Sequence, residues 1–313
     1  MTSAPAPARP LPIPAPPTTD ETIESYLQRI AHLNHVHIDE LKLHLGLNHT
    51  RWVETMNATG IGRLTAVTGR SRAELIRALP ELDERHKNPA LFRDTRRPAC
   101  PDCVRRHRGG PILRYYPPHI HVCTKHRIWI GHAFALSSPR PDTCLDISKI
   151  PEIPAAQRRH RRLAQCHGTL RTHDAFTCAR RIWDHTVDPL LTNPVADTLT
   201  LLNPTAVRHF TSDQAYPAAI YPKLVTITTM LLSSHWRRVA AHPDSRNEFF
   251  REANRRIHGG DHDWISGSHP LNQWVEHLVD QRNEHHQFHA RQVHRVTTHH
   301  GDSMNLANSR KKI

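Results

Sequence analysis

Apolar residues recur at helical spacing near the start of the chain. Between residues 23 and 31 they fall at positions i, i+3, i+4, i+7 and i+8, which predicts an amphipathic helix. Thr19 or Asp20 can cap the start of this helix. A second short helix, IDELKLHL, ends before Gly46, a residue type favoured just beyond a helix C-terminus. The inner face of the first helix is expected to consist of Ile23, Tyr26, Leu27, Ile30 and Ala31.

Residues 61–82, IGRLTAVTGRSRAELIRALPEL, have the pattern of a helix-turn-helix unit. A short apolar stripe precedes Gly69, which supplies a turn, and Ser71 with Glu74 has the spacing of a capping box. A second apolar face then ends at Pro80. An ordinary pair of packed helices shows the same pattern, so DNA recognition by this hairpin is one of two open interpretations. The apolar positions are Leu64 and Val67, followed by Leu75, Ile76 and Leu79.

Helical periodicity also dominates the second half of the chain. Pro154 favours a helix start and Gly168 a helix end, and later helical segments alternate with loops that carry Pro and Asn. The most apolar run, AAIYPKLVTITTMLL, is interrupted by Pro222 and Lys223 and is too short to span a bilayer, so it predicts a core helix. We therefore expect a mainly α, multi-helix fold with a helix-turn-helix-like N-terminal region.

The charge of the chain favours a polyanionic partner. Lys and Arg outnumber Asp and Glu by 42 to 29, a formal excess of +13 with 28 histidines counted as neutral. An excess of this size is typical of proteins that bind nucleic acid. A solubilising basic surface, or a compositional bias toward Arg and His, is the alternative interpretation.

The cysteines are expected to stay reduced. The start, MTSAPAPARPLPIPAPP, lacks the features of a signal peptide, which favours a cytoplasmic location. In that compartment closely paired cysteines indicate a metal site rather than disulfides. Cys144, Cys166 and Cys178 have no close pair and are predicted to be buried small hydrophobes.

Two close pairs of potential metal ligands lie in the middle of the chain. In RRPACPDCVRRHRGGPILRYYPPHIHVCTKHRIW, Cys100 and Cys103 are followed, after nineteen residues, by Cys123 and His126. Two such pairs joined by a loop can hold one tetrahedral zinc ion. Because all four ligands come from the protein, the expected site has no open position and is structural. The sequence therefore predicts a small zinc-knuckle insert with one Zn²⁺ per chain.

Histidines and aromatic residues surround these ligands. His107, His119 and His121 could substitute as ligands, but solvated side chains are the favoured interpretation. Tyr115, Tyr116 and Trp129 could contact nucleic acid, but core packing of a small metal module is favoured.

Arginines concentrate around the expected knuckle and beyond it. Residues 91–130 contain nine Lys or Arg and two Asp, and residues 155–183 contain seven Arg and one acid. Such clusters can neutralise phosphates. The candidate nucleic-acid-binding residues are Arg70, Arg72, Arg77, Arg105, Arg106, Arg108, Arg158, Arg159, Arg161 and Arg162.

The segments RPLPIPAPPTTDETIESYLQRIA and CPDC…HVCTKH resemble the TniQ family, the target-selection proteins of transposons. Its members open with Leu-Pro, a Pro-rich run and Ser-Tyr-Leu-x-Arg, followed by Cys-Pro-x-Cys and Cys-x-x-His. The resemblance covers about residues 9–165 and implies DNA binding. Together with the closed metal site, it makes a non-enzymatic DNA-binding adaptor the leading interpretation. It further implies docking on an AAA-type ATPase that recruits a transposase. The matching positions are Leu11–Pro17, Ser25–Arg29, Cys100–Cys103 and Cys123–His126.

The chain departs from the family pattern at two points. The usual Gly-Glu-Ser before the first helix is Asp20, Glu21 and Thr22 here. Some members have a second zinc knuckle, and this sequence has no second set of paired cysteines. The resemblance therefore supports one metal ion per chain.

These patterns divide the chain into five parts. We expect a Pro-rich disordered arm over residues 1–17 and an N-terminal helical region over 18–92. A zinc-knuckle module over 93–150 and a C-terminal helical region over 151–296 follow. A flexible tail over 297–313 ends the chain.

Two other functions remain open from the sequence. A stand-alone transcription regulator would use the helix-turn-helix as a dimer on a palindromic site. A metal-dependent nuclease would need a second ion, for which Asp261–Trp264, with His262, is the best local candidate. Exposed His-rich loops explain that segment more simply.

Overall fold

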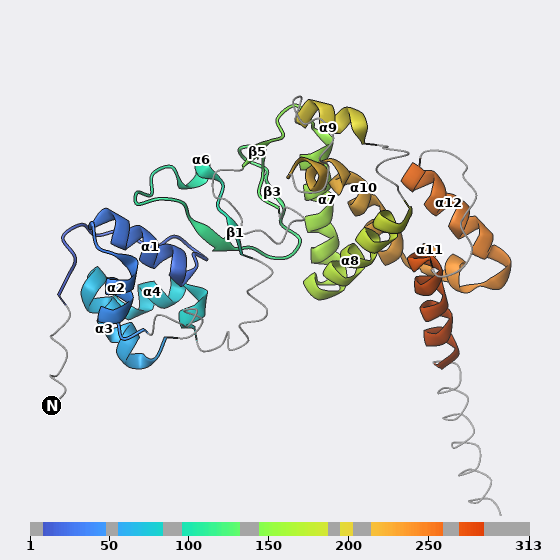
Figure 1. Cartoon of the computed structure of the whole chain (residues 1–313). Coiled ribbons are helices and arrows are strands. Elements are labelled where there is room, and N and C mark those ends of the chain that lie inside the picture. Colours follow the sequence, from blue (N-terminus) through green and yellow to red (C-terminus); the bar gives the residue numbers. More distant parts are fainter. Residues whose placement is uncertain are drawn as a thin grey trace, which may run out of the picture. The chain divides into compact units, whose positions relative to one another are not determined.

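The computed structural model describes residues 9–47, 56–83, 96–131, 144–186, 195–202, 214–258 and 269–284. These residues are mainly helical, with two small antiparallel sheets near residues 96–146 (Figure 1). The predicted fold class is thereby confirmed. The nuclease candidate Asp261–Trp264 and the expected tail 297–313 lie outside the described residues.

The chain divides into two compact units. The first comprises Met1–His173 and Val195–Pro222, and the second comprises Asp174–Pro194 and Lys223–Ile313. Two helices, introduced below, therefore contribute residues to both units. The domain boundaries expected from the sequence, after residues 92 and 150, remain predictions.

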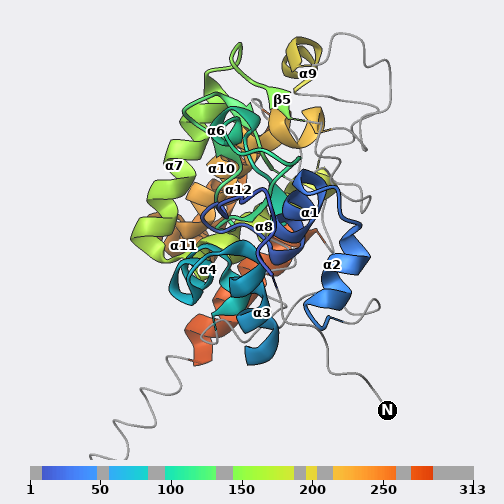
Figure 2. The ribbon, with the colours of Figure 1, turned by 90° about the vertical axis from the view of Figure 1, so that its left-hand side faces the viewer.

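Short helices build the start of the first unit around one apolar core (Figures 1 and 2). The predicted inner face of the first helix is confirmed, because all five of its residues are at most 2% exposed. Thr22 caps this helix by accepting the N–H of Ser25, so the expected cap at Thr19 or Asp20 is wrong. Gly46 has the left-handed φ of 77° expected after the second helix. The helices are α1 (Ile23–Leu33), α2 (Ile38–His44), α3 (Ala58–Thr68), α4 (Arg72–Ala78) and the 3-10 turn η1 (Pro80–Leu82).

The α3–α4 hairpin forms where the sequence predicts it. Gly69 ends α3 with φ 64°, and Ser71 caps α4 by accepting the N–H of Glu74. The side chain of Glu74 pairs with Arg70 at 3.1 Å rather than reaching back to Ser71, so only half of the capping box is present. The two helices are joined by a short turn, and residues of both belong to the N-terminal core.

The described part of the Pro-rich arm, residues 9–17, is packed rather than disordered. The N–H of Leu11 donates to the carbonyl of Val67 at 2.8 Å, and Ala15 is 5% exposed. The hydroxyl of Tyr26 donates to the carbonyl of Ala15 at 2.9 Å. Prolines without N–H groups suit such an extended segment, because their fixed φ lowers the entropy lost on docking.

Two small sheets and a short helix form the middle of the first unit. β1 (Arg96–Pro98) pairs antiparallel with β2 (Leu113–Tyr115), and α6 (Pro101–Val104) lies in the connection. β3 (Val122–Cys123), β4 (Ile128–Trp129) and β5 (Leu145–Asp146) form a three-stranded antiparallel sheet in that order. The registers Val122↔Trp129 and Ile128↔Asp146 define this second sheet.

The remaining helices confirm the predicted helical character of the second half. α7 starts with Pro154 in its first turn and ends at Gly168, as expected. The apolar run forms a helix with Pro222 inside it. None of the described helices is both long and apolar enough to cross a bilayer. The helices are α7 (Glu152–His167), α8 (Thr169–Thr186), α9 (Ala196–Leu202), α10 (Ala215–Leu232), α11 (Ser234–Ala241), η3 (Pro243–Ser245), α12 (Arg246–His258) and residues 270–284.

Aromatic packing forms part of the core of the second unit. Phe249 is fully buried, and its ring stacks on Trp274 with centroids 5.5 Å apart. Trp183 is also fully buried. Aromatic pairs of this kind contribute about 0.5–1.5 kcal/mol beyond their buried area.

Candidate metal centre and the cationic surface around it

The first pair of ligands is placed by the start of α6. Cys100 is the N-cap residue, and its carbonyl accepts the N–H of Cys103 at 3.0 Å and that of Val104 at 3.2 Å. Pro101 occupies the first helical position, where its missing N–H costs nothing. This single turn brings the two thiols to the same side of the chain.

The second pair is placed by the turn between β3 and β4. Cys123 ends β3, and His126 lies in the turn just before β4. Arg127 has the left-handed φ of 54°, and its carbonyl accepts the N–H of Ile147 at 2.9 Å. The left-handed residue reverses the chain, so that His126 faces back toward the first pair.

Four distances among the ligand atoms match those that a tetrahedral ion requires. The Sγ atoms of Cys103 and Cys123 are 3.7 Å apart. Nδ1 of His126 lies 3.3 Å from Sγ of Cys100, 3.3 Å from Sγ of Cys103 and 3.6 Å from Sγ of Cys123. A tetrahedron with bonds of about 2.3 Å to sulfur has edges of about 3.8 Å, and an S–N edge is about 3.5 Å. The residues therefore fit zinc.

Within the described residues, this cluster is the one group of His, Cys, Asp or Glu that could hold a metal ion. All its ligand atoms lie within 4.8 Å of one another. The set of three thiols and one imidazole leaves no position for water or substrate. The arrangement suits a structural ion rather than a catalytic one.

The protein environment disfavours ionisation of two of the thiols. Burial raises the pKa of Cys100 to about 12, and burial also raises the pKa of Cys103. Neutral thiols are poor ligands, whereas a bound Zn²⁺ deprotonates the thiols that coordinate it. Metal binding at this site should therefore release protons and weaken as the pH falls.

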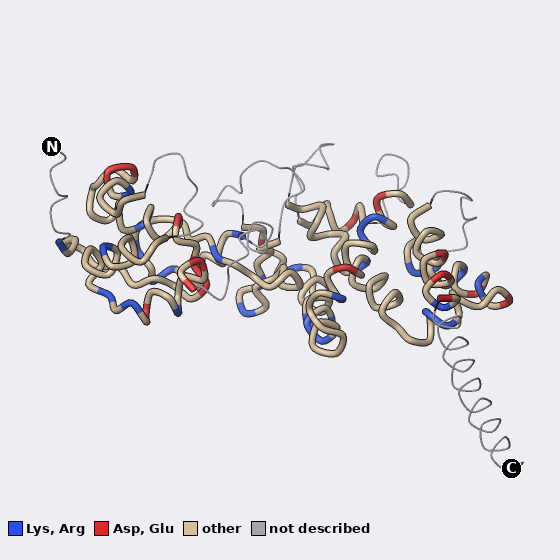
Figure 3. Tube along the Cα trace, turned by 90° about the horizontal axis from the view of Figure 1, so that it is seen from below, with Lys and Arg blue, Asp and Glu red and all other residues tan. Residues whose placement is uncertain are grey.

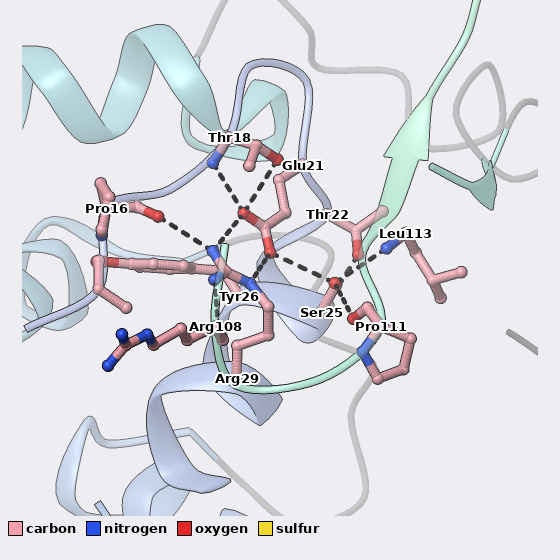
Figure 4. A network of polar contacts seen from close by, with 11 residues as sticks. Pro16, Thr18, Glu21, Thr22, Ser25, Tyr26, Arg29, Arg108, Pro111 and Leu113 are labelled. Carbon is pink, nitrogen blue, oxygen red and sulfur yellow. Dashed lines mark hydrogen bonds and ion pairs between the residues drawn. The ribbon is translucent and has the colours of Figure 1, made fainter. Parts of the chain in front are cut away.

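A buried ion pair between Glu21 and Arg29 connects α1 to the metal-binding segment (Figure 4). The carboxylate of Glu21 accepts hydrogen bonds from Nε and Nη2 of Arg29 at 2.7 and 2.9 Å, and both side chains are at most 1% exposed. Arg29 also donates to the carbonyls of Pro16 at 3.0 Å and Arg108 at 2.8 Å. The guanidinium thus joins the Pro-rich arm, α1 and the segment between the two pairs of ligands.

Ser25 makes a second connection between the same segments. Its hydroxyl accepts the N–H of Leu113 at 2.9 Å and lies 3.4 Å from the carbonyl of Pro111. Ser25 and Arg29 are the first and last residues of the Ser-Tyr-Leu-x-Arg pattern. Both polar positions of that pattern therefore have a structural role, which is to join α1 to the metal-binding segment.

The departure from Gly-Glu-Ser before α1 preserves the geometry. Asp20 has a left-handed φ of 60°, a conformation that Gly adopts freely and Asp tolerates. Glu21 keeps its place in the buried ion pair, and Thr22 supplies the N-cap hydroxyl in place of serine. The N–H of Thr22 donates to the carbonyl of Leu113, and the N–H of Tyr115 donates to that of Asp20. The three residues thus extend the β1–β2 sheet.

Gly109 and Gly110 offer a matched test of this packing. Both have positive φ, 101° and 118°, but a Cβ on Gly109 would lie 2.7 Å from the carbonyl oxygen of Arg29, whereas one on Gly110 meets nothing within 4 Å. Gly110→Ala should cost about 1–3 kcal/mol from backbone strain. Gly109→Ala should cost about 1–3 kcal/mol more from overpacking. Urea unfolding measures both, and equal losses would contradict the described approach of the two segments.

The other side of the knuckle packs on α7 (Figure 1). His121 stacks on Trp129 with ring centroids 5.7 Å apart and on His160 at 5.8 Å. His119 is half-buried, and burial together with the nearby Arg161 lowers its pKa. Burial lowers the pKa of His160 to about 3, so this imidazole is neutral at pH 7. The expectation that His119 and His121 are solvated is therefore wrong, and neither belongs to the metal cluster.

The three aromatic residues near the knuckle have packing roles, as favoured from the sequence. Trp129 is 2% exposed. The hydroxyl of Tyr115 donates to the carboxylate of Glu81 at 2.7 Å. The ring of Tyr116 lies 5.2 Å from the guanidinium carbon of Arg97, which is itself 1% exposed. Burial lowers the pKa of Arg97 to about 10.

Nine of the ten candidate DNA-contacting arginines are exposed. Arg70 is the exception, since it is half-buried and paired with Glu74. Residues 96–131 hold eight Lys or Arg and one Asp. Figure 3 shows Lys and Arg at many points along the described chain. The exposed arginines are Arg72 and Arg77 on α4, Arg105, Arg106 and Arg108 after the first two ligands, and Arg158, Arg159, Arg161 and Arg162 on α7.

Two cations beside the ligands were not predicted as candidate contacts from the sequence, and the predicted burial of one cysteine is wrong. Lys125 and Arg127 flank His126 and are exposed. Their positions within and just after Cys-x-x-His could have indicated them. Cys166 is exposed, which contradicts its predicted burial, and Cys144 and Cys178 are half-buried. On α7, Cys166 follows the exposed Arg158 and Arg162 at intervals of four residues and lies outside the buried stripe.

The comparison with protein families agrees with this arrangement. The model of the TniQ family matches residues 12–129. This range includes the packed arm, α1, the α3–α4 hairpin and all four metal ligands. The searches of curated proteins and of solved structures gave no match. Residues 12–129 of this chain are a TniQ family domain.

Proposed function

We propose that this protein is a non-enzymatic, DNA-binding adaptor that selects target DNA for a transposon. The TniQ domain associates the chain with transposition. In this role the protein would dock on an AAA-type ATPase, which in turn recruits the transposase. The metal cluster would hold one structural Zn²⁺ per chain, bound by Cys100, Cys103, Cys123 and His126.

The observation that carries the proposal is the combination of a closed metal site with exposed arginines on its flanks. Arg105, Arg106 and Arg108 follow the first two ligands directly and are exposed. α7 packs against β3, which contains Cys123, and carries four more arginines on its exposed side. Long cationic side chains on a fixed support are suited to phosphate contacts, which position a protein on DNA.

The absence of an open metal position supports an adaptor rather than an enzyme. A hydrolytic metal site keeps at least one position for water or substrate, whereas this cluster consists of four protein ligands. The ion would therefore stabilise the fold around the arginines. The α3–α4 hairpin, with exposed Arg72 and Arg77, would supply further DNA contacts within the same adaptor.

DNA affinity should fall steeply with salt and with loss of the α7 arginines. Each phosphate contact contributes about −0.9 to the slope of log K against log salt concentration. Replacing Arg158, Arg159, Arg161 and Arg162 together by Glu should weaken duplex binding at least about tenfold and reduce the steepness of that slope by about 3–4. Fluorescence anisotropy with a labelled duplex, titrated at several salt concentrations, measures both quantities.

A matched control comes from exposed arginines elsewhere. Arg238 on α11 and Arg251 on α12 are exposed and belong to the second unit. The Arg238→Glu/Arg251→Glu protein should keep most of the wild-type affinity after allowance for its net charge. A salt-independent affinity, or equal losses in the two variants, would contradict the proposed interface.

A further inference from the structure

Gln157 connects the helix that carries four exposed arginines to the segment that carries two metal ligands. Its side chain is fully buried. Its Oε1 accepts the N–H of His121 at 2.7 Å and that of Val122 at 3.0 Å, and its Nε2 donates to the carbonyl of His119 at 2.8 Å. Val122 directly precedes the ligand Cys123. One side chain of α7 thus fixes the backbone immediately before the second pair of ligands.

These hydrogen bonds lie in an enclosed environment. The hydroxyl of Tyr221, on α10 and within the same unit, donates to Oε1 of Gln157 at 3.2 Å. Tyr221 is 1% exposed and its ring lies 5.3 Å from that of Trp129. A buried amide that is left without hydrogen-bond partners destabilises the folded state, because water does not reach it to replace those bonds. The position of α7 and the ordered conformation of residues 119–123 therefore depend on each other.

The arginines of α7 lie outside the stripe of buried residues that includes Gln157. The buried residues Ile153, Ala156, Gln157, His160 and Ala164 form one stripe along α7. Arg158 and Arg161 flank this stripe and are exposed. A change in how the stripe is held would shift the guanidinium groups relative to the knuckle.

Metal binding would affect the hydrogen bonds of Gln157 through the β3–β4 turn. Ligation of Cys123 and His126 orders the β3–β4 turn, because metal binding and local folding are coupled. An ordered turn presents the N–H groups of His121 and Val122 to Gln157 in fixed positions. Loss of the ion would release them and loosen the attachment of α7.

We infer that Gln157 is a positioning residue that couples metal binding to DNA binding. The inference rests on the proposed function, since it requires that the arginines of α7 contact DNA. Coupling of this kind is reciprocal: if zinc raises DNA affinity by some factor, DNA raises zinc affinity by the same factor. Zinc and DNA would then bind this protein cooperatively although no zinc ligand touches the duplex.

The coupling factor can be measured on the whole 313-residue chain. Zinc affinity is determined by competition with a chromophoric chelator, with and without a saturating labelled duplex, and DNA affinity is determined by anisotropy with and without zinc. In the wild type we expect a factor of about 5–150 in both directions. Gln157→Met keeps the volume of the side chain but removes its hydrogen bonds. It should still bind zinc, with a coupling factor that falls to within about twofold of one.

Thr228→Val provides a matched control. Thr228 is also fully buried in a helix, but its hydroxyl donates to the carbonyl of Leu224 on its own helix, at 2.7 Å. This variant should keep the wild-type coupling factor. If Gln157→Met does not fold, Gln157→Glu serves in its place, because its carboxylate still accepts the N–H groups of His121 and Val122 and should retain an intermediate factor.

The outcomes separate the inference from the proposed function. Wild-type protein that binds DNA equally well with and without zinc would overturn the coupling but leave the DNA-binding role intact. Undiminished coupling in Gln157→Met would overturn the role of this residue. Wild-type protein that binds no DNA under any condition would overturn both.

Discussion

Cys103→Ser protein should contain no more than about one-tenth of the zinc held by the wild type. A serine hydroxyl does not replace a thiolate as a zinc ligand, and three remaining ligands leave the ion open to water and to chelators. Cys103 is exposed, so the substitution itself disturbs little packing. Elemental analysis of the purified proteins by mass spectrometry measures the zinc content.

Loss of the ion should also unfold the knuckle locally. Structural zinc binds with an apparent free energy of about 10–16 kcal/mol in small zinc modules, which exceeds what so short a segment can obtain from its core. Limited proteolysis should therefore cleave Cys103→Ser between residues 100 and 126 faster than the wild type. The core of α1–α4 should remain folded, since its apolar contacts do not involve the ligands.

Cys166→Ser is the matched control for this prediction. Cys166 is the other exposed cysteine among the described residues, and it lies on α7 outside the metal cluster. Its substitution should leave zinc content and proteolysis unchanged. Undiminished zinc in Cys103→Ser would show that the ligands are assigned wrongly.

Arg29→Met should lower the free energy of unfolding by about 3–5 kcal/mol. The substitution leaves the carboxylate of Glu21, which is fully buried, without its cation. It also removes the donors to the carbonyls of Pro16 and Arg108, so that the arm and the metal-binding segment both lose a bond to α1 (Figure 4). Urea denaturation followed by circular dichroism measures the change.

A partly exposed ion pair provides the comparison. Arg180 and Asp184 are 2.7 Å apart on α8, with side chains 25% and 44% exposed. Arg180→Met should cost no more than about 1 kcal/mol, since water reaches both groups of this pair and compensates much of its loss. The double variant Glu21→Met/Arg29→Met should recover part of the loss, because it removes the unpaired charge. Equal effects of Arg29→Met and Arg180→Met would contradict the role of the buried pair.

The features predicted correctly from the sequence are those with local causes. The inner face of α1 follows from the spacing of Ile23, Tyr26 and Ile30, and the turn at Gly69 follows from the conformational freedom of glycine. The grouping of four side chains that could hold a metal ion follows from two close pairs at a spacing that a single ion can bridge. In each case the residues concerned lie within a few positions of one another, or the spacing of the ligand pairs itself implies that the two pairs meet in the fold.

The features that were missed depend on contacts between distant segments. Arg29 bonds the carbonyl of Arg108, 79 residues away, and no local pattern specifies that partner. Gln157 is a polar residue in a stretch rich in arginine, yet it is fully buried because the backbone near Val122 supplies its hydrogen bonds. The N-cap lies at Thr22 because the left-handed Asp20 turns the chain two residues earlier.

X-ray absorption at the zinc K-edge of the purified 313-residue protein determines the ligands of the bound ion. A single ion held by Cys100, Cys103, Cys123 and His126 predicts a shell of three sulfurs at about 2.3 Å and one nitrogen at about 2.0 Å. It also predicts one zinc per chain. A shell with fewer than three sulfurs, or one that includes a water oxygen, would contradict a closed site formed by these four ligands.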